Sequence, residues 1–223
     1  MVFRHEWKIE INPTDLFVLR QRLRAIAKPD PHAVNGKYFI RSLYFETPTD
    51  KALREKIDGV NRREKFRFRY YNHDSNLIRL EKKSKLNGLC NKQMIEISAE
   101  QAQKIIDGDL SWMRSSKAPL IQELNSKMAI ERLQPKVIVD YTREPFVYPP
   151  GNVRITFDYN IRTGLNSKDF LNPDCVMIPA GDAPILMEVK WDAFMPNIIR
   201  DAIRLKGRRA AAFSKYAQCR IYG

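Results

Sequence analysis

Strand-like segments in which charged side chains alternate with aromatic or aliphatic ones constrain this chain more than any other feature. The clearest segment, residues 64–72, has the sequence Glu-Lys-Phe-Arg-Phe-Arg-Tyr-Tyr-Asn. Successive side chains of a strand point to opposite faces, so this segment has one cationic face and one aromatic face. The same kind of alternation recurs in residues 2–10, 76–84, 152–161 and 184–192. Because the apolar faces need burial, we expect the charged faces of these strands to share one surface.

Further strand-like segments cover residues 37–46, 89–97 and 135–147, which gives about eight strands in all. Helical periodicity covers residues 13–27, 99–107, 118–131 and 196–212, and residues 162–183, with several Pro and Gly, are expected to form a long loop. Ser98 and Gln101 are spaced as in a capping box at the start of the second of these helices.

Two architectures bury the apolar faces: an open sheet whose charged side meets water, and a closed barrel with a polar interior. Closure removes sheet edges, and about eight strands leave an interior wide enough for a small ligand. We therefore expect an α+β fold: a closed antiparallel β-barrel, or tunnel, with helices packed outside. Residues 1–223 are expected to form this single domain.

The formal net charge of +13 favours a polyanionic partner. The charged faces concentrate cations in one predicted interior: Arg4, Lys8, Lys65, Arg67, Arg69, Arg79, Lys83, Arg143, Arg154 and Lys190. They also supply the carboxylates of Glu6, Glu81, Asp158 and Glu188. Phosphates suit such a surface, because Arg donates bidentate hydrogen bonds and Lys is a point charge. Carboxylates among these cations are natural ligands for Mg²⁺ or Mn²⁺ bridging the phosphates.

Other classes of function have little support. Nucleic acid is not the expected partner, because base-stacking proteins place aromatic rings on the charged face, and here the rings are predicted to lie opposite it. The three histidines are too few for a His-based metal site or triad, and Cys90, Cys175 and Cys219 are expected to be reduced and structural. No apolar run reaches the ~20 residues of a membrane span. The charged start does not fit a signal peptide, so we expect a cytoplasmic protein.

Short motifs occur in order along nearly the whole chain: Arg4–Lys8, Ser42–Thr47, Lys65–Arg69, Leu80–Lys83, Pro135–Arg143, Val153–Asp158, Leu186–Lys190 and Ser214–Tyr216. Through them the chain resembles the VTC (vacuolar transporter chaperone) domain, within the triphosphate tunnel metalloenzyme or CYTH-like superfamily. Three departures stand out: Glu46 replaces the usual aspartate, the first strand lacks the full glutamate set of tunnel triphosphatases, and these 223 residues are expected to lack the accessory phosphate-sensing and membrane modules of some relatives.

The resemblance implies a β-tunnel in which a divalent metal, Mn²⁺ or Mg²⁺, assists transfer of the ATP γ-phosphate to inorganic polyphosphate. The catalytic, phosphate-gripping set is predicted to be Lys8, Arg67, Arg69, Lys83, Arg143, Arg154 and Lys215. The substrate-binding set is predicted to be Arg4, Lys65, Arg79, Tyr141, Lys190 and Ser214. Glu188 is the principal predicted metal ligand.

Several roles stay open on the sequence. Glu6 and Glu81 are either further metal ligands or ion-pair partners of interior cations, and Asp158 is expected to orient an arginine. The basic run at 204–209 is expected to be a solvated helix face.

Three functions remain in competition. The first is a polyphosphate polymerase that uses ATP with polyphosphate or pyrophosphate, and for which a membrane-protein partner stays open. The second is a triphosphatase of the same fold, and the third is a noncatalytic polyanion-binding domain.

Overall fold

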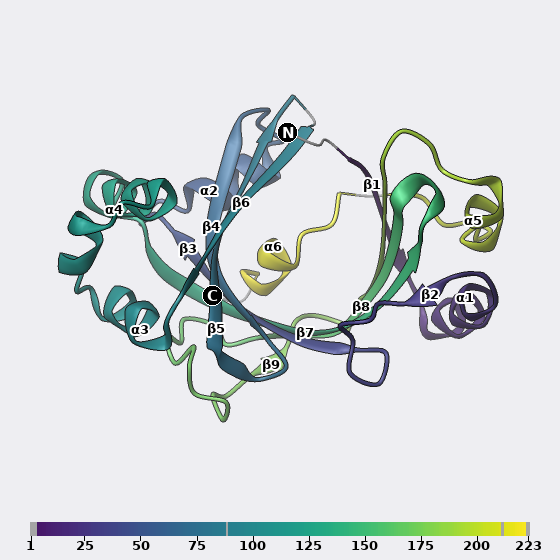
Figure 1. Ribbon diagram of the computed structural model, residues 1–223, viewed down its shortest axis with the longest axis horizontal. Helices are drawn as coiled ribbons and strands as arrows, with labels where there is room; N and C mark the ends of the chain where they lie inside the picture. The colour runs from purple at the N-terminus through teal and green to yellow at the C-terminus, as the bar shows by residue number, and fades with distance from the viewer. Residues whose placement is uncertain (1–3, 88, 211, 222–223) are drawn as a thin grey trace.

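One antiparallel sheet organises the protein. The computed structural model describes residues 4–87, 89–210 and 212–221. In sheet order, the long strands are β1 (His5–Ile11), β10 (Ile185–Trp191), β8 (Val153–Thr163), β7 (Gln134–Tyr148), β3 (Tyr38–Glu46), β4 (Arg63–Tyr71), β5 (Asp74–Leu86) and β6 (Leu89–Ile97). Two short strands extend it: β2 (Lys28–Pro29) pairs with β7, and β9 (Ile178–Pro179) pairs with β8. The sheet curls around a concave centre (Figure 1).

The sheet is not closed by hydrogen bonds. Within the described residues β1 and β6 are the two ends of the strand order, and no backbone pairing joins them. The closed barrel expected from the sequence is therefore not shown, whereas the α+β class and the large antiparallel sheet are confirmed. Side chains do reach across the seam, since Lys83 Nζ on β5 lies 3.9 Å from Glu6 Oε1 on β1. Alternation fixes the face of each residue but does not determine whether the first and last strands meet.

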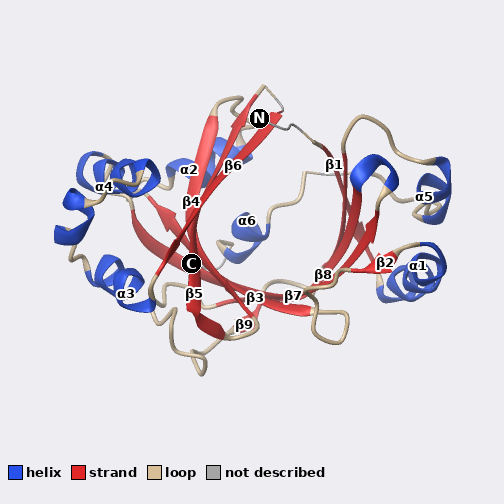
Figure 2. Ribbon diagram, in the orientation of Figure 1, coloured by secondary structure: helices blue, strands red, loops and turns tan. Residues whose placement is uncertain are grey.

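Two groups of helices cover the outer face of the sheet (Figure 2). On one side lie α1 (Pro13–Ile26) and α5 (Asn197–Ala202), and on the other lie α3 (Ala99–Asp107), the 3₁₀ turn η1 (Ser111–Ser115) and α4 (Pro119–Ile130). The predicted capping box of Ser98 and Gln101 is present at the start of α3, and Asn12 with Asp15 forms another at α1. These caps satisfy backbone N–H groups that have no partner inside the helix.

The predicted apolar faces pack beneath these helices. Phe66 and Phe68 of β4 are fully buried in the cluster that includes Ile105 of α3 and Leu124 of α4. Phe157 of β8 is buried in a second cluster with Leu19 and Leu23 of α1. Burial of each large apolar side chain contributes roughly 1.5–3 kcal/mol. The alternation therefore assigned the outward face of these strands correctly.

The predicted helix over 196–212 is wrong. Helix α5 ends at Ala202, and Gly207 adopts a positive φ of 77° that stops any continuation. The basic run at 204–209 therefore lies beyond the helix and not on a helix face. The predicted strand at 2–10 begins at His5, and its residues 2–3 lie outside the described part of the chain.

Two short helices were not predicted. Helix α2 (Lys51–Ile57) follows β3, and α6 (Lys215–Cys219) follows the C-terminal loop. Helix α6 lies within the curve of the sheet and not outside it (Figure 1), and Tyr216 is buried against Val137 and Val139 of β7. No helix among the described residues is long and apolar enough to cross a bilayer.

Candidate functional site

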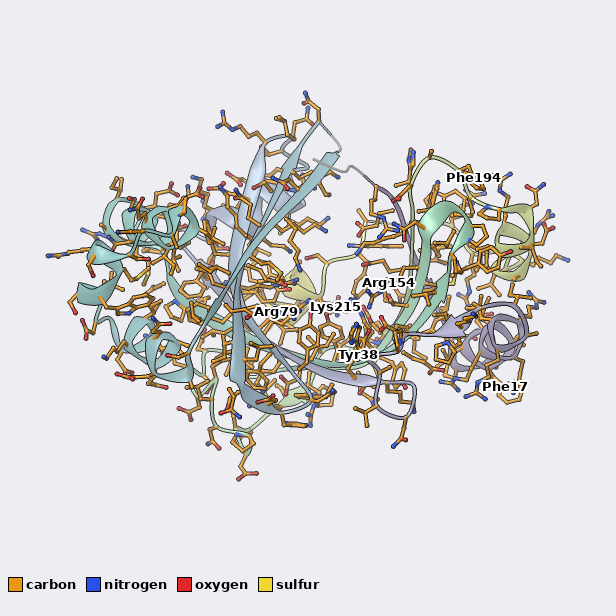
Figure 3. All side chains as sticks on the ribbon, viewed as in Figure 1. Phe17, Tyr38, Arg79, Arg154, Phe194 and Lys215 are labelled. Atoms are coloured by element: carbon orange, nitrogen blue, oxygen red, sulfur yellow. The ribbon has the colours of Figure 1, made fainter. Side chains whose placement is uncertain are left out.

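The concave face of the sheet and α6 enclose a cavity of about 1520 Å³. Every site residue predicted from the sequence lines it except Glu81, which lies just behind the wall. Figure 3 shows Tyr38, Arg79, Arg154 and Lys215 around this centre, whereas Phe17 and Phe194 lie at the outer end of the molecule. The described lining contains fifteen Lys and Arg side chains against four Asp and Glu side chains. Such an excess of positive charge favours a ligand that carries several negative charges.

Strands β1 and β10 place two carboxylates between lysines. Antiparallel pairing sets Lys8 opposite Glu188 and Glu6 opposite Lys190. Lys190 Nζ lies 2.5 Å from Glu188 Oε1 and 3.4 Å from Glu6 Oε1. Lys8 Nζ lies 3.7 Å from Glu188 and 3.5 Å from Glu6. This arrangement brings Glu188, the principal predicted metal ligand, and Glu6, a further candidate ligand, against the same two lysines.

The cations around these carboxylates control their protonation. Burial opposes the charge of Glu188, but Lys190, Lys8 and other cations outweigh it and lower its pKa well below the ordinary value. Burial also opposes the charge of Lys8, yet Glu188 and Glu6 raise the pKa of that lysine. Glu188 and Lys8 are therefore both charged near neutral pH.

Strand β4 holds two arginines in fixed orientations. Arg67 donates from Nε to Glu81 Oε2 at 2.8 Å and from Nη1 to the Tyr44 hydroxyl at 2.8 Å. Arg69 donates to Ser42 Oγ at 3.0 Å and to the Tyr141 hydroxyl at 3.0 Å. Neutral partners leave the charge of Arg69 uncompensated for a ligand in the cavity.

Glu81 differs from the other predicted metal ligands. Its side chain is 1% exposed, and Oε1 accepts from Lys92 at 2.7 Å while Oε2 accepts from Arg67. Both oxygens are thus already engaged by cations. Burial opposes the charge of Glu81, but Arg67 and Arg69 lower its pKa below the ordinary value. The geometry fits the ion-pair role that the sequence left open for this residue.

Asp158 of β8 positions two cations with one carboxylate. Arg143 donates to it through two hydrogen bonds of 2.7 Å, and Lys215 Nζ lies 2.5 Å from Oδ2. Asp158 is completely buried, so the pair orients Arg143 as the sequence predicted. The ammonium of Lys215 also lies over the Tyr141 ring, 4.7 Å from its centroid. Asp158 therefore connects α6 to the cationic wall.

The remaining predicted residues also line the cavity. Arg154 contacts the Tyr38 hydroxyl at 2.8 Å and Asp30 at 3.0 Å. Arg4 contacts Asp192 at 2.7 Å. Ser214 uses its hydroxyl to accept from the backbone of α6. Arg79 Nε is buried without a hydrogen-bond partner among the described residues, and its guanidinium lies 5.3 Å from the Tyr71 ring centroid.

Lys65 has no carboxylate partner among the described residues. Its ammonium lies 5.3 Å from the ring centroid of Tyr44 and 5.6 Å from that of Tyr216. Burial, together with Arg67 and other nearby cations, lowers the pKa of Lys65 to about 7. Burial opposes ionisation of Tyr44, but Arg67, Lys65 and Arg69 together lower its pKa to about 7. Two coupled groups in the cavity therefore change charge near neutral pH.

The sequence analysis missed several residues of the wall. Lys92 of β6 pairs directly with Lys83 and therefore shares its face. Alternation in residues 89–97 was the signal for it, since Ile95 and Ile97 pack on the opposite side. The tyrosines Tyr38 and Tyr44 also line the cavity. The expectation that aromatic rings lie only opposite the charged face is therefore wrong, because strand β3 contributes Tyr38 and Tyr44 to the interior.

The donor set around Glu188 fits a divalent metal of the Mg²⁺ type. Such ions use one or two carboxylates and complete their shell with water and phosphate oxygens. Glu6 and Glu188 supply two carboxylates that already share the ammonium groups of Lys8 and Lys190. The described residues contain no cluster of three or more acidic, His or Cys ligands. A metal here would therefore depend on the phosphates of a bound ligand.

Comparisons with known proteins agree with this architecture. The family model described as the VTC domain matches residues 3–222. No curated protein matches the chain at a significant level. A solved structure from Hippeastrum, of a candidate adenylyl cyclase described as having a dominant triphosphatase activity, has a TM-score of 0.59 at 12% identity, covering 98% of this chain and 95% of that one. A candidate adenylate cyclase from Bacillus halodurans has a TM-score of 0.53 at 12% identity, covering 85% and 80%. At this identity the two likenesses show a shared fold alone.

Proposed function

The chain belongs to the VTC domain family, and from this premise we propose that it is a metal-dependent polyphosphate polymerase. It would transfer the γ-phosphate of ATP to a growing inorganic polyphosphate chain. We also propose that residues 1–223 act as one domain, in the cytoplasm, and that side chains complete the tunnel where backbone pairing does not close it. The observation that carries the proposal is the convergence of Arg67, Arg69, Arg143 and Arg154 with Glu188 on one cavity.

The proposed reaction needs little covalent chemistry from the protein. A phosphate oxygen of the acceptor attacks the γ-phosphorus, and the bond to the ADP oxygen breaks. Catalysis of such a transfer is mainly positioning and charge stabilisation. Arg67, held by Glu81 and Tyr44, and Arg143, held by Asp158, present oriented guanidinium groups to the phosphate oxygens.

The other cations assist this set. Lys8, Lys83 and Lys215 supply point charges along the wall, and Arg4, Lys65, Arg79 and Lys190 extend the positive surface on which the product chain would lie. Glu188, with Glu6, would hold a divalent metal, which would supply positive charge to neutralise phosphate oxygens. Glu81 acts in this proposal as the partner of Arg67 and not as a metal ligand.

A triphosphatase is the second candidate. The described activity of the Hippeastrum relative of this fold favours it. Strand β1, however, has only Glu6 and Glu10 as acidic residues, and of these Glu6 alone lines the cavity. A noncatalytic polyanion-binding domain is the third candidate, and it would use the same cations.

One assay separates the three functions. Purified protein is incubated with ATP and Mn²⁺, and the products are separated on a polyphosphate gel with parallel measurement of ADP and phosphate. Long polymer with equivalent ADP supports the polymerase. Release of free phosphate without polymer supports the triphosphatase, and absence of both products contradicts each enzymatic proposal. Arg200→Ala is a matched control, because Arg200 is exposed on α5 and does not line the cavity.

A further inference from the structure

Thr156 of β8 has a buried hydroxyl without a hydrogen-bond partner among the residues that the structure describes. The residue is 3% exposed and lines the cavity. Its Oγ1 has no hydrogen-bond partner within the described part of the chain. Buried hydroxyl groups are normally hydrogen-bonded, because leaving one unpaired costs its full desolvation free energy. The hydroxyl therefore calls for a ligand that the protein itself does not supply.

Several other hydroxyl groups of the cavity wall are already engaged. The Tyr44 and Tyr141 hydroxyls accept from Arg67 and Arg69, and the Tyr38 hydroxyl donates to Asp30. Thr156 thus differs from these tyrosines, because its hydroxyl has no hydrogen-bond partner among the described residues. A β-strand position that needed only packing would be filled equally well by valine, which has the same shape without the polar atom.

The place of Thr156 indicates the chemistry of its ligand. Antiparallel pairing puts Thr156 directly opposite Glu188, and side chains in such pairs are close neighbours. On its own strand the residues two positions away on the same face are Arg154 and Asp158, and Asp158 holds Arg143. The hydroxyl therefore lies between two arginine groups of the wall.

We propose that Thr156 is a phosphate-binding residue that donates its hydroxyl hydrogen to a phosphate oxygen held between Arg154 and Arg143. The inference rests on the phosphate binding of the proposed function, and it does not depend on turnover. Thr156 lies opposite Glu188. An uncharged hydroxyl at this position can donate to a phosphate oxygen, whereas another cation there would pair with the Glu188 carboxylate.

The test uses inorganic triphosphate without metal, so that binding is measured apart from chemistry. The Kd of the wild type, Thr156→Val and Thr156→Ser is determined by titration calorimetry, with Tm of each unliganded protein. We expect Thr156→Val to weaken binding roughly 10- to 100-fold, as for loss of a hydrogen bond to a charged group. Thr156→Ser keeps the donor and is expected to stay close to the wild type. The Tm of unliganded Thr156→Val should be equal to or above that of the wild type.

Each outcome decides between the two proposals. If the wild type does not bind triphosphate, both the proposed function and this inference fail. If the wild type binds and Thr156→Val binds with the same Kd, this inference alone is overturned. A lower Tm for unliganded Thr156→Val would show that the hydroxyl has a structural partner, and would also overturn it.

Discussion

Individual carboxylates in this cavity have separable roles, because their partners differ. Glu81 and Asp158 are completely or almost completely buried, and each holds a guanidinium group in place. Glu188 and Glu6 instead share lysines at the cavity surface, where a phosphate-bound metal would lie. Carboxylates behind the wall thus position arginines, whereas carboxylates at the cavity surface offer ligands for a metal.

Substitution of Glu188 tests the proposed metal ligand. Glu188→Gln is expected to abolish turnover with ATP and Mn²⁺, because it removes the charge that would bind the ion. Binding of triphosphate without metal should be retained or become tighter, since a negative charge leaves the anion site. Turnover assays and calorimetry measure the two effects. Glu100→Gln, on the solvent side of α3, is the control, and full activity in Glu188→Gln would exclude the metal-binding role.

The coupled pair of Lys65 and Tyr44 predicts proton uptake on binding. Burial, together with nearby cations, lowers the pKa of Lys65 to about 7, and Arg67, Lys65 and Arg69 lower the pKa of Tyr44 to about 7 against the effect of burial. A bound polyanion favours the protonated form of both groups, so both pKa values rise and protons are taken up near pH 7–8. Titration calorimetry of triphosphate in buffers of different ionisation enthalpy measures this uptake.

The control for this prediction is the double variant Lys65→Met with Tyr44→Phe. Proton release by the ligand itself is common to both proteins and cancels in the difference. The wild type should take up more protons than the variant, and equal values would contradict a coupled pair that titrates near neutral pH.

At the scale of elements, Glu46 joins two short helices to the sheet. The carboxylate accepts from the backbone N–H groups of Ala52 and Leu53 at the start of α2, each at 3.0 Å. It also accepts from the Tyr216 hydroxyl of α6. The residue that replaces the usual aspartate is therefore the structural link between β3, α2 and α6.

Removal of this link should loosen α6. Glu46→Ala is expected to lower the free energy of unfolding by roughly 1–3 kcal/mol, because buried donors lose their acceptor. Tyr216→Phe removes the contact of Glu46 with α6 but leaves the acceptor of Ala52 and Leu53, and should have a smaller effect. Chemical denaturation measures both values, and an unchanged stability of Glu46→Ala would contradict the structural role.

At the scale of the whole molecule, charge repulsion across the cavity opposes folding. Fifteen cationic side chains line the described wall with only four acidic ones. A multivalent anion should relieve this repulsion and bind the folded state alone. Triphosphate at 100 times its Kd is expected to stabilise the protein by about 2.7 kcal/mol.

Thermal unfolding with and without triphosphate measures this stabilisation. Raised NaCl should reduce the triphosphate effect, because salt screens the attraction. Arg200→Ala should show the same shift as the wild type, since Arg200 lies outside the cavity. If the increase in Tm caused by triphosphate did not change with the NaCl concentration, an electrostatic origin of the stabilisation would be contradicted.

The sequence by itself determined the faces of the strands. The alternation in β4 predicted that Phe66 and Phe68 are buried outside and that Arg67 and Arg69 lie inside, because a strand has a period of two. It predicted most of the strand cations of the cavity wall for the same reason, whereas Lys215 and Ser214 came from the resemblance, and the motifs predicted the family.

Tertiary structure alone decided which elements meet. Among the described residues no backbone pairing joins β1 to β6, and α6 lies inside the curve of the sheet. The partners of Glu81 and Asp158, and the unpaired hydroxyl of Thr156, follow from distances between strands. Local periodicity sets the direction of each side chain, whereas contacts between residues far apart in the chain depend on the curl and register of the complete sheet.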